Sequence, residues 1–264
     1  MTSLVDVVNG GRDGNEKRLP PIELASSRQH SGRQFQPVAE VDLGPFAAQA
    51  GKTLISRGQA QILVTELPGP YGIVDLGLIS ARFSPLRHRL SSPVEPLLNE
   101  VDAAIVAVTS PVHAMSLTDV SSRLPRFSET ALRTRVEHLV DREVLSTTST
   151  GSLRKRPGVV PLGHLHAVES KVRDWRRGLD QALRYSLWTH SSSVVVARLP
   201  KNMNRVVDLF RSRGVGLVLG EVWLVRPVRR QLSLDRHMWA SEHFVAAIGL
   251  DPALLVHEEP QAAS

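Results

Sequence analysis

Apolar residues recur along the chain with two spacings, and each spacing predicts one kind of element. Residues 61–67 and 71–80 are rich in apolar side chains and are joined by Pro-Gly-Pro, which predicts two consecutive strands. A third strand is predicted over 164–171, and apolar residues at helical spacing follow over 174–188. The pattern then predicts a strand at 193–199, a helix at 203–213 and two strands at 214–219 and 222–225. Strands and helices therefore alternate over this part of the chain.

The stretch between the second and third strands has the pattern of three helices. They are predicted at 93–110, 117–124 and 128–142, and Ser128 is the expected N-cap of the third helix. The apolar stripe of that helix leaves four polar residues pointing outward: Thr130, Arg133, Thr134 and Glu137.

A basic hairpin is predicted after the third helix, over 145–160, because Thr-Ser-Thr-Gly-Ser is followed there by three basic residues. The three helices and the hairpin together resemble a winged helix-turn-helix domain, over about 94–161. The resemblance implies contacts with DNA bases and phosphates. The implied contact residues are Thr130, Arg133 and Thr134 on the helix and Arg154, Lys155 and Arg156 on the hairpin. A three-helix module that contacts protein is the alternative.

Asp75 interrupts an otherwise apolar strand, and a buried carboxylate is costly unless it is paired or coordinates a metal ion. At the end of the third strand, Glu169 and Lys171 share one face, because side chains two positions apart in a strand point the same way. A carboxylate beside an ammonium group could hold a cation and orient a water against a phosphate. A hydrogen-bonded structural Asp75 and an exposed ion pair between Glu169 and Lys171 are the alternatives.

The order of these residues and elements resembles the restriction-endonuclease-like superfamily, the PD-(D/E)xK nucleases, over about 60–90 and 164–228. The resemblance implies that Asp75 and Glu169 bind Mg²⁺ or Mn²⁺ and that Lys171 is the catalytic lysine. The implied fold class is α/β (α+β), a restriction-endonuclease-like mixed sheet flanked by helices, with an inserted winged helix-turn-helix domain.

Further positions extend the resemblance. Gln181 and Tyr185 match the Gln-x-x-x-Tyr motif of the exonuclease branch, which implies an accessory role at the active site. Residues 37–57 are expected to supply the helix that precedes the first strand in this fold, with Glu40 as an additional acid. Val74 stands where the family motif has proline.

The predicted organisation has four parts. They are a disordered segment over 1–35, a nuclease-like domain over 36–92 and 162–250, an inserted winged helix-turn-helix domain over 93–161, and a flexible tail over 251–264. Trp175 and Trp188 share the apolar side of one predicted helix, so both are expected in the core rather than as platforms for base stacking.

Composition favours a partner that carries phosphate. The 264 residues have a formal net charge of +6 and include no cysteine, which excludes a disulfide framework and thiolate chemistry. The sequence has more arginine than lysine, and the guanidinium fork suits phosphate. No apolar stretch reaches the length of a membrane span, and the N-terminus lacks the pattern of a signal peptide. DNA rather than a membrane is the expected partner, and the cytoplasm the expected location.

Two functions follow as expectations. In the first, the chain is a Mg²⁺-dependent deoxyribonuclease whose insert grips DNA. In the second, it is a winged-helix transcriptional regulator, and the nuclease-like domain is catalytically inactive or serves to form a homodimer.

Overall fold

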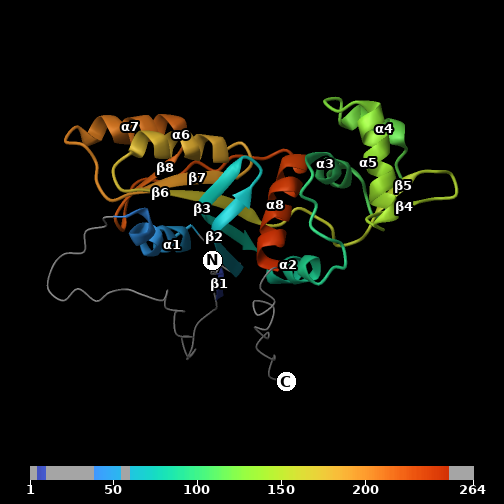
Figure 1. The fold of residues 1–264 in the computed structure, drawn as a ribbon, viewed down its shortest axis with the longest axis horizontal. Helices are drawn as coiled ribbons and strands as arrows, with labels where there is room; N and C mark the ends of the chain where they lie inside the picture. Colours follow the sequence, from blue (N-terminus) through green and yellow to red (C-terminus); the bar gives the residue numbers. More distant parts are fainter. Residues whose placement is uncertain (1–4, 10–38, 55–59, 250–264) are drawn as a thin grey trace, which may run out of the picture.

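The computed structural model describes residues 5–9, 39–54 and 60–249, and it has a mixed α/β fold (Figure 1). Its sheet strands are β1 (Val5–Asn9), β2 (Ala60–Gly69), β3 (Gly72–Ala81), β6 (His164–Lys171), β7 (Ser191–Val196), β8 (Gly216–Leu219) and β9 (Val222–Val225), in this order in space. The neighbours β6, β7 and β8 are parallel, and the other neighbouring pairs are antiparallel. Parallel neighbours need long crossovers, so helices connect them.

Helices cover both faces of this sheet. The crossover helices α6 (Trp175–Tyr185) and α7 (Met203–Arg213) lie on one face, and the short helix η1 (Glu40–Leu43) with α1 (Gly44–Lys52) lies on the other (Figure 1). Helix α8 (Leu234–Gly249) packs beside α6 against the part of the sheet formed by β2 and β3. The leading helix that the sequence predicts within 37–57 is therefore present as η1 and α1.

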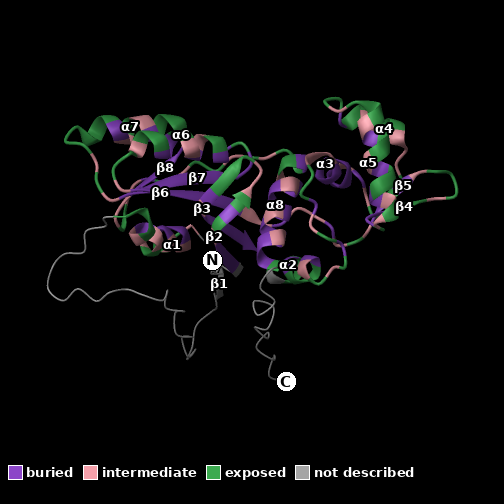
Figure 2. Cartoon of the chain, viewed as in Figure 1, coloured by how far each residue is buried: buried purple, intermediate pink, exposed green. Residues whose placement is uncertain are grey.

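The central strands are buried on both faces, and their polar side chains are buried with the apolar ones. All residues of β7 are buried (Figure 2). Val194 packs with Phe210 below α6 and α7, whereas Val195 packs with Ala47 on the α1 face. A strand buried on both sides is typically a continuous apolar run, and the part of β7 with that pattern is 194–196, whereas its first three residues are buried serines.

Residues between β3 and β6 form a group of helices with a hairpin. Its elements are α3 (Glu100–Val108), α4 (Leu117–Arg123), α5 (Glu129–Asp141), β4 (Leu145–Thr147) and β5 (Leu153–Lys155). The predicted cap is confirmed, because the Ser128 side chain accepts a hydrogen bond from the backbone NH of Ala131 at 3.2 Å. A backbone bridge between Met115 and Leu153 adds a third extended segment beside the hairpin.

The insert, defined here as residues 93–161, shares its core with the larger part of the chain. Its buried cluster includes Ile105, Leu132 and Leu153, and Met238 of α8 belongs to the same cluster. Trp239 packs against it as well and donates a hydrogen bond from Nε1 to the carbonyl oxygen of Leu98 at 2.8 Å. Because α8 closes the core of the insert, the two predicted domains share one helix.

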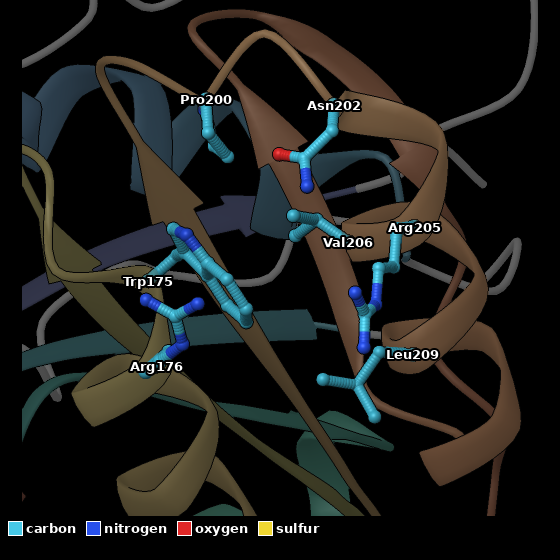
Figure 3. Close-up of a pocket in the computed structure, with 7 residues that line it drawn as sticks. All are labelled: Trp175, Arg176, Pro200, Asn202, Arg205, Val206 and Leu209. Carbon is cyan, nitrogen blue, oxygen red and sulfur yellow. The ribbon is translucent and has the colours of Figure 1, made fainter.

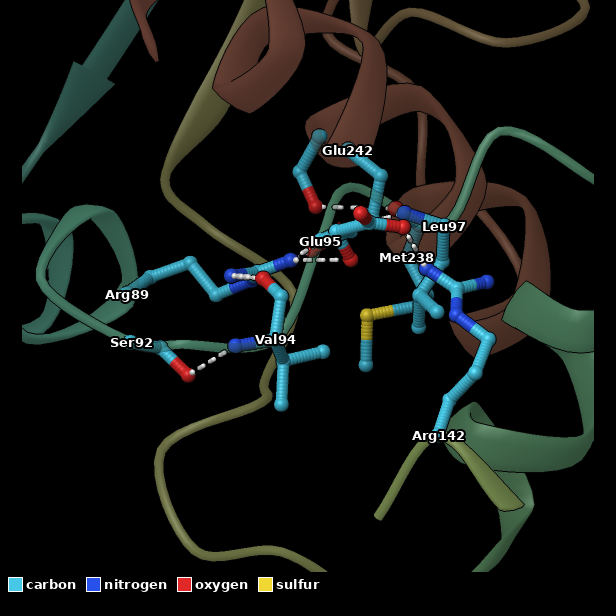
Figure 4. Close-up of polar contacts among 9 residues, drawn as sticks. Arg89, Ser92, Val94, Glu95, Leu97, Arg142, Met238 and Glu242 are labelled. Atoms are coloured by element: carbon cyan, nitrogen blue, oxygen red, sulfur yellow. Dashed lines mark hydrogen bonds and ion pairs between the residues drawn. The ribbon is translucent and has the colours of Figure 1, made fainter. Parts of the chain in front are cut away.

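A buried ion pair connects the first residues of the insert with α8 (Figure 4). Arg89, in α2 (Phe83–Leu90), donates from Nε to Oε1 of Glu242 in α8 at 2.9 Å. Arg89 also donates to the carbonyl oxygen of Val94 at 2.9 Å, and Glu242 accepts from the backbone NH of Leu97 at 2.9 Å. Both charged side chains are almost fully buried. The pair therefore holds residues 94–97 against α8.

The ends of the chain require one correction. Residues 5–9, which the sequence places in a disordered segment, form strand β1 and pair with β2 from Val5 opposite Val64 to Asn9 opposite Ala60. The β-branched residues of this stretch suit an edge strand. The rest of segment 1–35 and the tail 251–264 lie outside the described residues. None of the helices in the described part of the chain has the length and apolar character needed to span a bilayer.

Candidate active site

Asp75 and Glu169 lie on neighbouring strands at the same end of the sheet. The ladder between β3 and β6 ends with Leu76 opposite Val168, so Asp75 and Glu169 are the next opposed positions. Opposed residues of antiparallel strands project to the same face. The structure thus brings together two carboxylates that are far apart in the sequence.

Lys171 lies beside them, two positions after Glu169. Its Nζ is 2.8 Å from Oε1 of Glu169, 3.1 Å from Oε2 of Glu40 and 3.0 Å from the carbonyl oxygen of Ser170. The lysine is 6% exposed. The pair of Glu169 and Lys171 is therefore buried, which rules out the exposed ion pair, and Glu40 joins it as an additional acid.

Asp75 makes a hydrogen bond of the kind expected for a structural aspartate. Its Oδ2 accepts from the backbone NH of Ser170 at 2.7 Å. Burial is the largest influence on this carboxyl and raises its pKa; the Ser170 hydrogen bond and the charge of Lys171 oppose that effect but do not cancel it. The negative charges of Glu40 and Glu66 raise the pKa further.

Glu66 adds a third carboxylate at this level of the sheet. The register of β2 and β3 pairs Thr65 with Leu76 and Leu67 with Val74, which leaves Glu66 opposite Asp75. The backbone of Glu66 is left-handed, with φ of 49°. That conformation is strained for a residue other than glycine, and such strain is concentrated at functional sites.

Burial also raises the pKa of Glu169, helped by the charge of Asp75 and opposed by Lys171 and Tyr185. For Lys171, burial alone favours the neutral amine, but hydrogen bonds and charges from Glu169 and Glu40 outweigh it, so the pKa of this lysine is raised. The site therefore holds an ammonium group among carboxylates that ionise less readily than usual.

Helix α6 supplies two more residues to the site. The hydroxyl of Tyr185 lies 2.9 Å from Oε2 of Glu169 and 2.9 Å from the carbonyl oxygen of Ile73, so it can donate to either. Burial first, and then the charge of Glu169, raise the pKa of Tyr185. The side chain of Gln181 hydrogen-bonds to Tyr185, and its Oε1 is buried without a partner in the described part of the chain. The structure thus places Tyr185 next to Glu169, and Gln181 next to Tyr185.

The donor set fits a hard divalent cation. Among the described residues, no three side chains of the His, Cys, Asp or Glu type are arranged to hold a metal ion by themselves. Mg²⁺, however, is usually held by one or two carboxylates and completes its shell with water and substrate phosphate. Asp75 and Glu169 supply two carboxylates that could hold such an ion, and Gln181, which contacts Tyr185, has an Oε1 without a partner among the described residues.

Strand alternation keeps His166 away from Glu169. His166 points to the α1 face, where its ring nitrogens lie 2.7 Å from Oγ of Ser191 and 2.9 Å from Oγ of Ser193. Burial lowers its pKa to about 3, so it is neutral near pH 7. This histidine has a structural role on the opposite face of the sheet from Glu169.

The predicted DNA contacts of the insert have mixed outcomes. Thr130, Thr134 and Arg154 are exposed. Arg133 is exposed but paired with Glu129 at 2.9 Å, and Arg156 lies 3.7 Å from Glu143.

Lys155 requires a correction. It is 8% exposed, and its Nζ donates to the carbonyl oxygen of Val106 at 3.1 Å. Burial accordingly lowers its pKa. Alternation along β5 turns this side chain inward between the exposed Arg154 and the half-buried Arg156, so its ammonium group is not available to a phosphate.

The surface around Trp175 was not predicted from the sequence. Trp188 is buried as expected, at 1% exposure. Trp175 is only partly buried and lines a pocket of about 470 Å³ between α6 and α7. The cluster of arginines around it, over 172–213, was the available signal.

No family model, curated protein or solved structure matches the chain.

Proposed function

We propose that the protein hydrolyses phosphodiester bonds of DNA at the site formed by Asp75, Glu169 and Lys171, with Mg²⁺ or Mn²⁺ as cofactor. The observation that carries the proposal is the convergence of the buried Glu169 and the half-buried Asp75, both carboxylates of raised pKa, with an ammonium group at one end of β3 and β6. Carboxylates with raised pKa values are stabilised when a cation binds beside them, and strongly perturbed groups cluster at functional sites.

The order of elements supports the same proposal. A leading helix, the antiparallel strands β2, β3 and β6, helix α6 and the parallel strand β7 follow one another as the resemblance to the nuclease superfamily implies. Residues 93–161 lie between β3 and β6, where the resemblance requires an insertion.

Asp75 and Glu169 would hold the cation, which when bound polarises a phosphate oxygen and lowers the pKa of a coordinated water. Lys171 keeps its proton near pH 7 because its pKa is raised, so it acts as a positive charge and hydrogen-bond donor toward phosphate or water, not as a base. Glu40 and Glu169 fix its position through their contacts with Nζ. Tyr185 orients Glu169 through its hydroxyl.

A cleavage assay tests the proposal. Purified protein would be incubated with duplex, single-stranded, nicked and branched DNA in the presence of Mg²⁺, Mn²⁺ or EDTA. We expect metal-dependent cleavage of at least one form, and a loss of rate by about 10²–10³-fold in Lys171→Met, the range for removal of one donor to a developing charge. Asp75→Asn and Glu169→Gln should also abolish cleavage. Glu221→Gln, an exposed acid in the turn before β9, is the control and should retain it.

A second function, a winged-helix DNA-binding regulator with a silent nuclease-like part, is favoured by one observation. Lys171 is already paired with Glu169 and Glu40, so its ammonium group has partners without a bound phosphate or metal ion. The exposed residues Thr130, Thr134 and Arg154 on the insert would then contact DNA. DNA binding in EDTA that falls when Arg133 and Arg154 are changed to Ala, without cleavage of any substrate in Mg²⁺ or Mn²⁺, would establish this function in place of the first.

A further inference from the structure

The positive charge of the protein is concentrated on the surface formed by α6, α7 and the loops before them. Residues 172–213 contain nine arginines and lysines and three aspartates, a formal net charge of +6 that equals the charge of the whole chain. All nine basic residues are exposed. We call this the α6/α7 surface.

The insert shows the opposite distribution. Residues 93–161 contain eight arginines and lysines and eight acidic residues, so their formal net charge is zero. Five of these arginines are in ion pairs with carboxylates: Arg126, Arg133, Arg135, Arg142 and Arg156. Lys155 is buried. The insert therefore offers few cations to a polyanion, although the sequence pattern placed the DNA contacts there.

Several positively charged side chains of the α6/α7 surface are not in the ion pairs found among the described residues. Arg211 pairs with Asp208 at 2.7 Å, whereas none of the ion pairs between described residues involves Arg176, Lys201 or Arg205. Neutralising phosphates with such side chains releases counterions and drives the binding of nucleic acid.

A pocket in this surface has the lining expected for a nucleobase with its phosphate (Figure 3). Trp175 and Arg176 of α6 face Arg205 and Leu209 of α7 across a volume of about 470 Å³, and Pro200 and Val206 complete its apolar walls. The guanidinium group of Arg176 lies 4.5 Å from the centre of the Trp175 ring. Aromatic rings stack on bases of any sequence, and neighbouring arginines hold the phosphates.

The pocket adjoins the candidate active site through α6. Trp175 follows Lys171 by four residues, and Gly178, one turn further along the helix, faces the stem of Lys171. The rise of a helix places Trp175 and Gly178 about 4.5 Å apart along its axis. The first turn of α6 thus connects the pocket with the stem of Lys171.

From these observations we infer that the α6/α7 surface binds a single strand of nucleic acid, with one unpaired base in the Trp175 pocket and phosphates on Arg176, Lys201 and Arg205. This inference rests on the proposed function, because it names the form of the substrate. A base in a duplex is stacked and paired, so the pocket selects a single-stranded segment over a continuous duplex.

The first test measures binding in EDTA, where cleavage does not contribute. A fluorescent (dT)20 strand is titrated with the wild type and with the triple variant Arg176→Ala, Lys201→Ala, Arg205→Ala. We expect the triple variant to bind at least tenfold more weakly and to reduce the slope of log Kd against log salt by about two, since each contact with a single strand contributes about 0.7.

A matched triple variant controls for the loss of three charges. Arg82→Ala, Arg87→Ala, Arg123→Ala removes exposed arginines of other surfaces and should change the affinity by less than about threefold, because these residues lie outside the surface. Equal losses in the two triple variants would overturn the inference. So would a larger loss in the double variant Arg133→Ala, Arg154→Ala, which would move the binding surface to the insert.

The pocket is tested separately with Trp175→Leu and Trp175→Phe. We expect the leucine variant to weaken (dT)20 binding between about fivefold and a hundredfold, as for the loss of one stacked base, and the phenylalanine variant to retain most of the affinity. Inorganic polyphosphate should bind both variants like the wild type. Equal weakening for polyphosphate, or a wild type that prefers a blunt duplex to (dT)20, would refute the base pocket. Binding without cleavage would refute the proposed function and leave this inference standing.

Discussion

Asp75 has two opposing effects on the stability of the fold. It accepts a hydrogen bond from the backbone of Ser170, which stabilises the strand pair, yet burial raises its pKa. The folded protein therefore ionises this carboxyl less readily than the unfolded chain does. Below the ordinary pKa of 3.8 the carboxyl is neutral in both states, and as the pH rises through the folded pKa its ionisation lowers the stability of the fold.

The variant Asp75→Asn should separate stability from function. Asparagine keeps an oxygen that accepts from Ser170 and stays neutral at every pH. We expect it to raise the free energy of unfolding at pH 7.5 by about 0.5–2 kcal/mol, the usual gain from one stabilising substitution. This difference from the wild type should disappear as the pH falls toward 4, where the wild-type carboxyl is protonated. Urea denaturation at a series of pH values measures it. A variant less stable than the wild type at pH 7.5 would show that the hydrogen bond to Ser170 is the dominant effect. Asp180→Asn, at an exposed position of α6, is the control and should show no such dependence on pH.

Arg89 and Glu242 form the most deeply buried ion pair in the described part of the chain, with side chains 1% and 0% exposed. Removing one member of such a pair leaves an uncompensated charge. Arg89→Met should therefore lower the free energy of unfolding by about 3–5 kcal/mol, as measured in urea.

The control for this prediction is Arg142→Met. Arg142 pairs with Glu95, whose side chain is 79% exposed, and should lose less than about 1 kcal/mol. The double variant Arg89→Met, Glu242→Gln should recover part of the loss, because no buried charge is then left unpaired. The interpretation would be abandoned if Arg89→Met cost no more than Arg142→Met.

At the scale of elements, α6 approaches the sheet closely because Gly178, in its first turn, has no side chain. A Cβ atom on Gly178 would lie 2.7 Å from Cγ1 of Val194 and 3.1 Å from Cγ of Lys171. Both neighbours are buried, so neither can move freely. Glycine here allows the helix to cover Lys171 and to bring Tyr185 to Glu169.

Gly178→Ala tests this packing. In an exposed helix the change would be stabilising by about 1 kcal/mol, since alanine is the better helix former. Here we expect a loss of about 1–3 kcal/mol from overpacking, together with reduced cleavage because the stem of Lys171 is displaced. Thermal unfolding and the cleavage assay measure the two effects. Gain of stability with unchanged cleavage would show that α6 can move away at no cost.

At the scale of the whole molecule, the sheet and the insert are joined through α8. One side of this helix packs Phe244 into the sheet core, and another places Met238 in the core of the insert. Arg89 and Glu242 hold the connecting segment between the two cores. The insert is therefore expected to unfold together with the sheet, not as an independent domain.

Met238→Ala should weaken this connection. Loss of a fully buried methionine costs about 2–5 kcal/mol, and the loss falls on the insert core. We expect the single unfolding transition of the wild type to separate into two, with helical circular dichroism changing at lower urea than the fluorescence of Trp188 in the sheet core. A variant that keeps one coincident transition would contradict this division.

The local elements and the candidate site residues could be predicted from the amino-acid sequence. Apolar runs and helical spacing predicted β2, β3, β6, α6 and α7 close to their observed bounds, because the burial of each element restricts its residues to such patterns. Asp75, Glu169 and Lys171 could be selected because charged residues are rare in strands that are otherwise apolar.

Tertiary structure alone decided the register, the shared helix and the placement of charge. The opposition of Asp75 and Glu169 depends on pairing between strands separated by the insert, which local pattern does not encode. Lys155 looks exposed in a basic triplet but alternation and the carbonyl group of Val106 bury it. Trp175 looks like a core residue on its helix but lines a pocket that exists only once α7 packs beside α6. In each case the deciding interaction joins segments far apart in the chain, so its free energy has no signature in the nearby sequence.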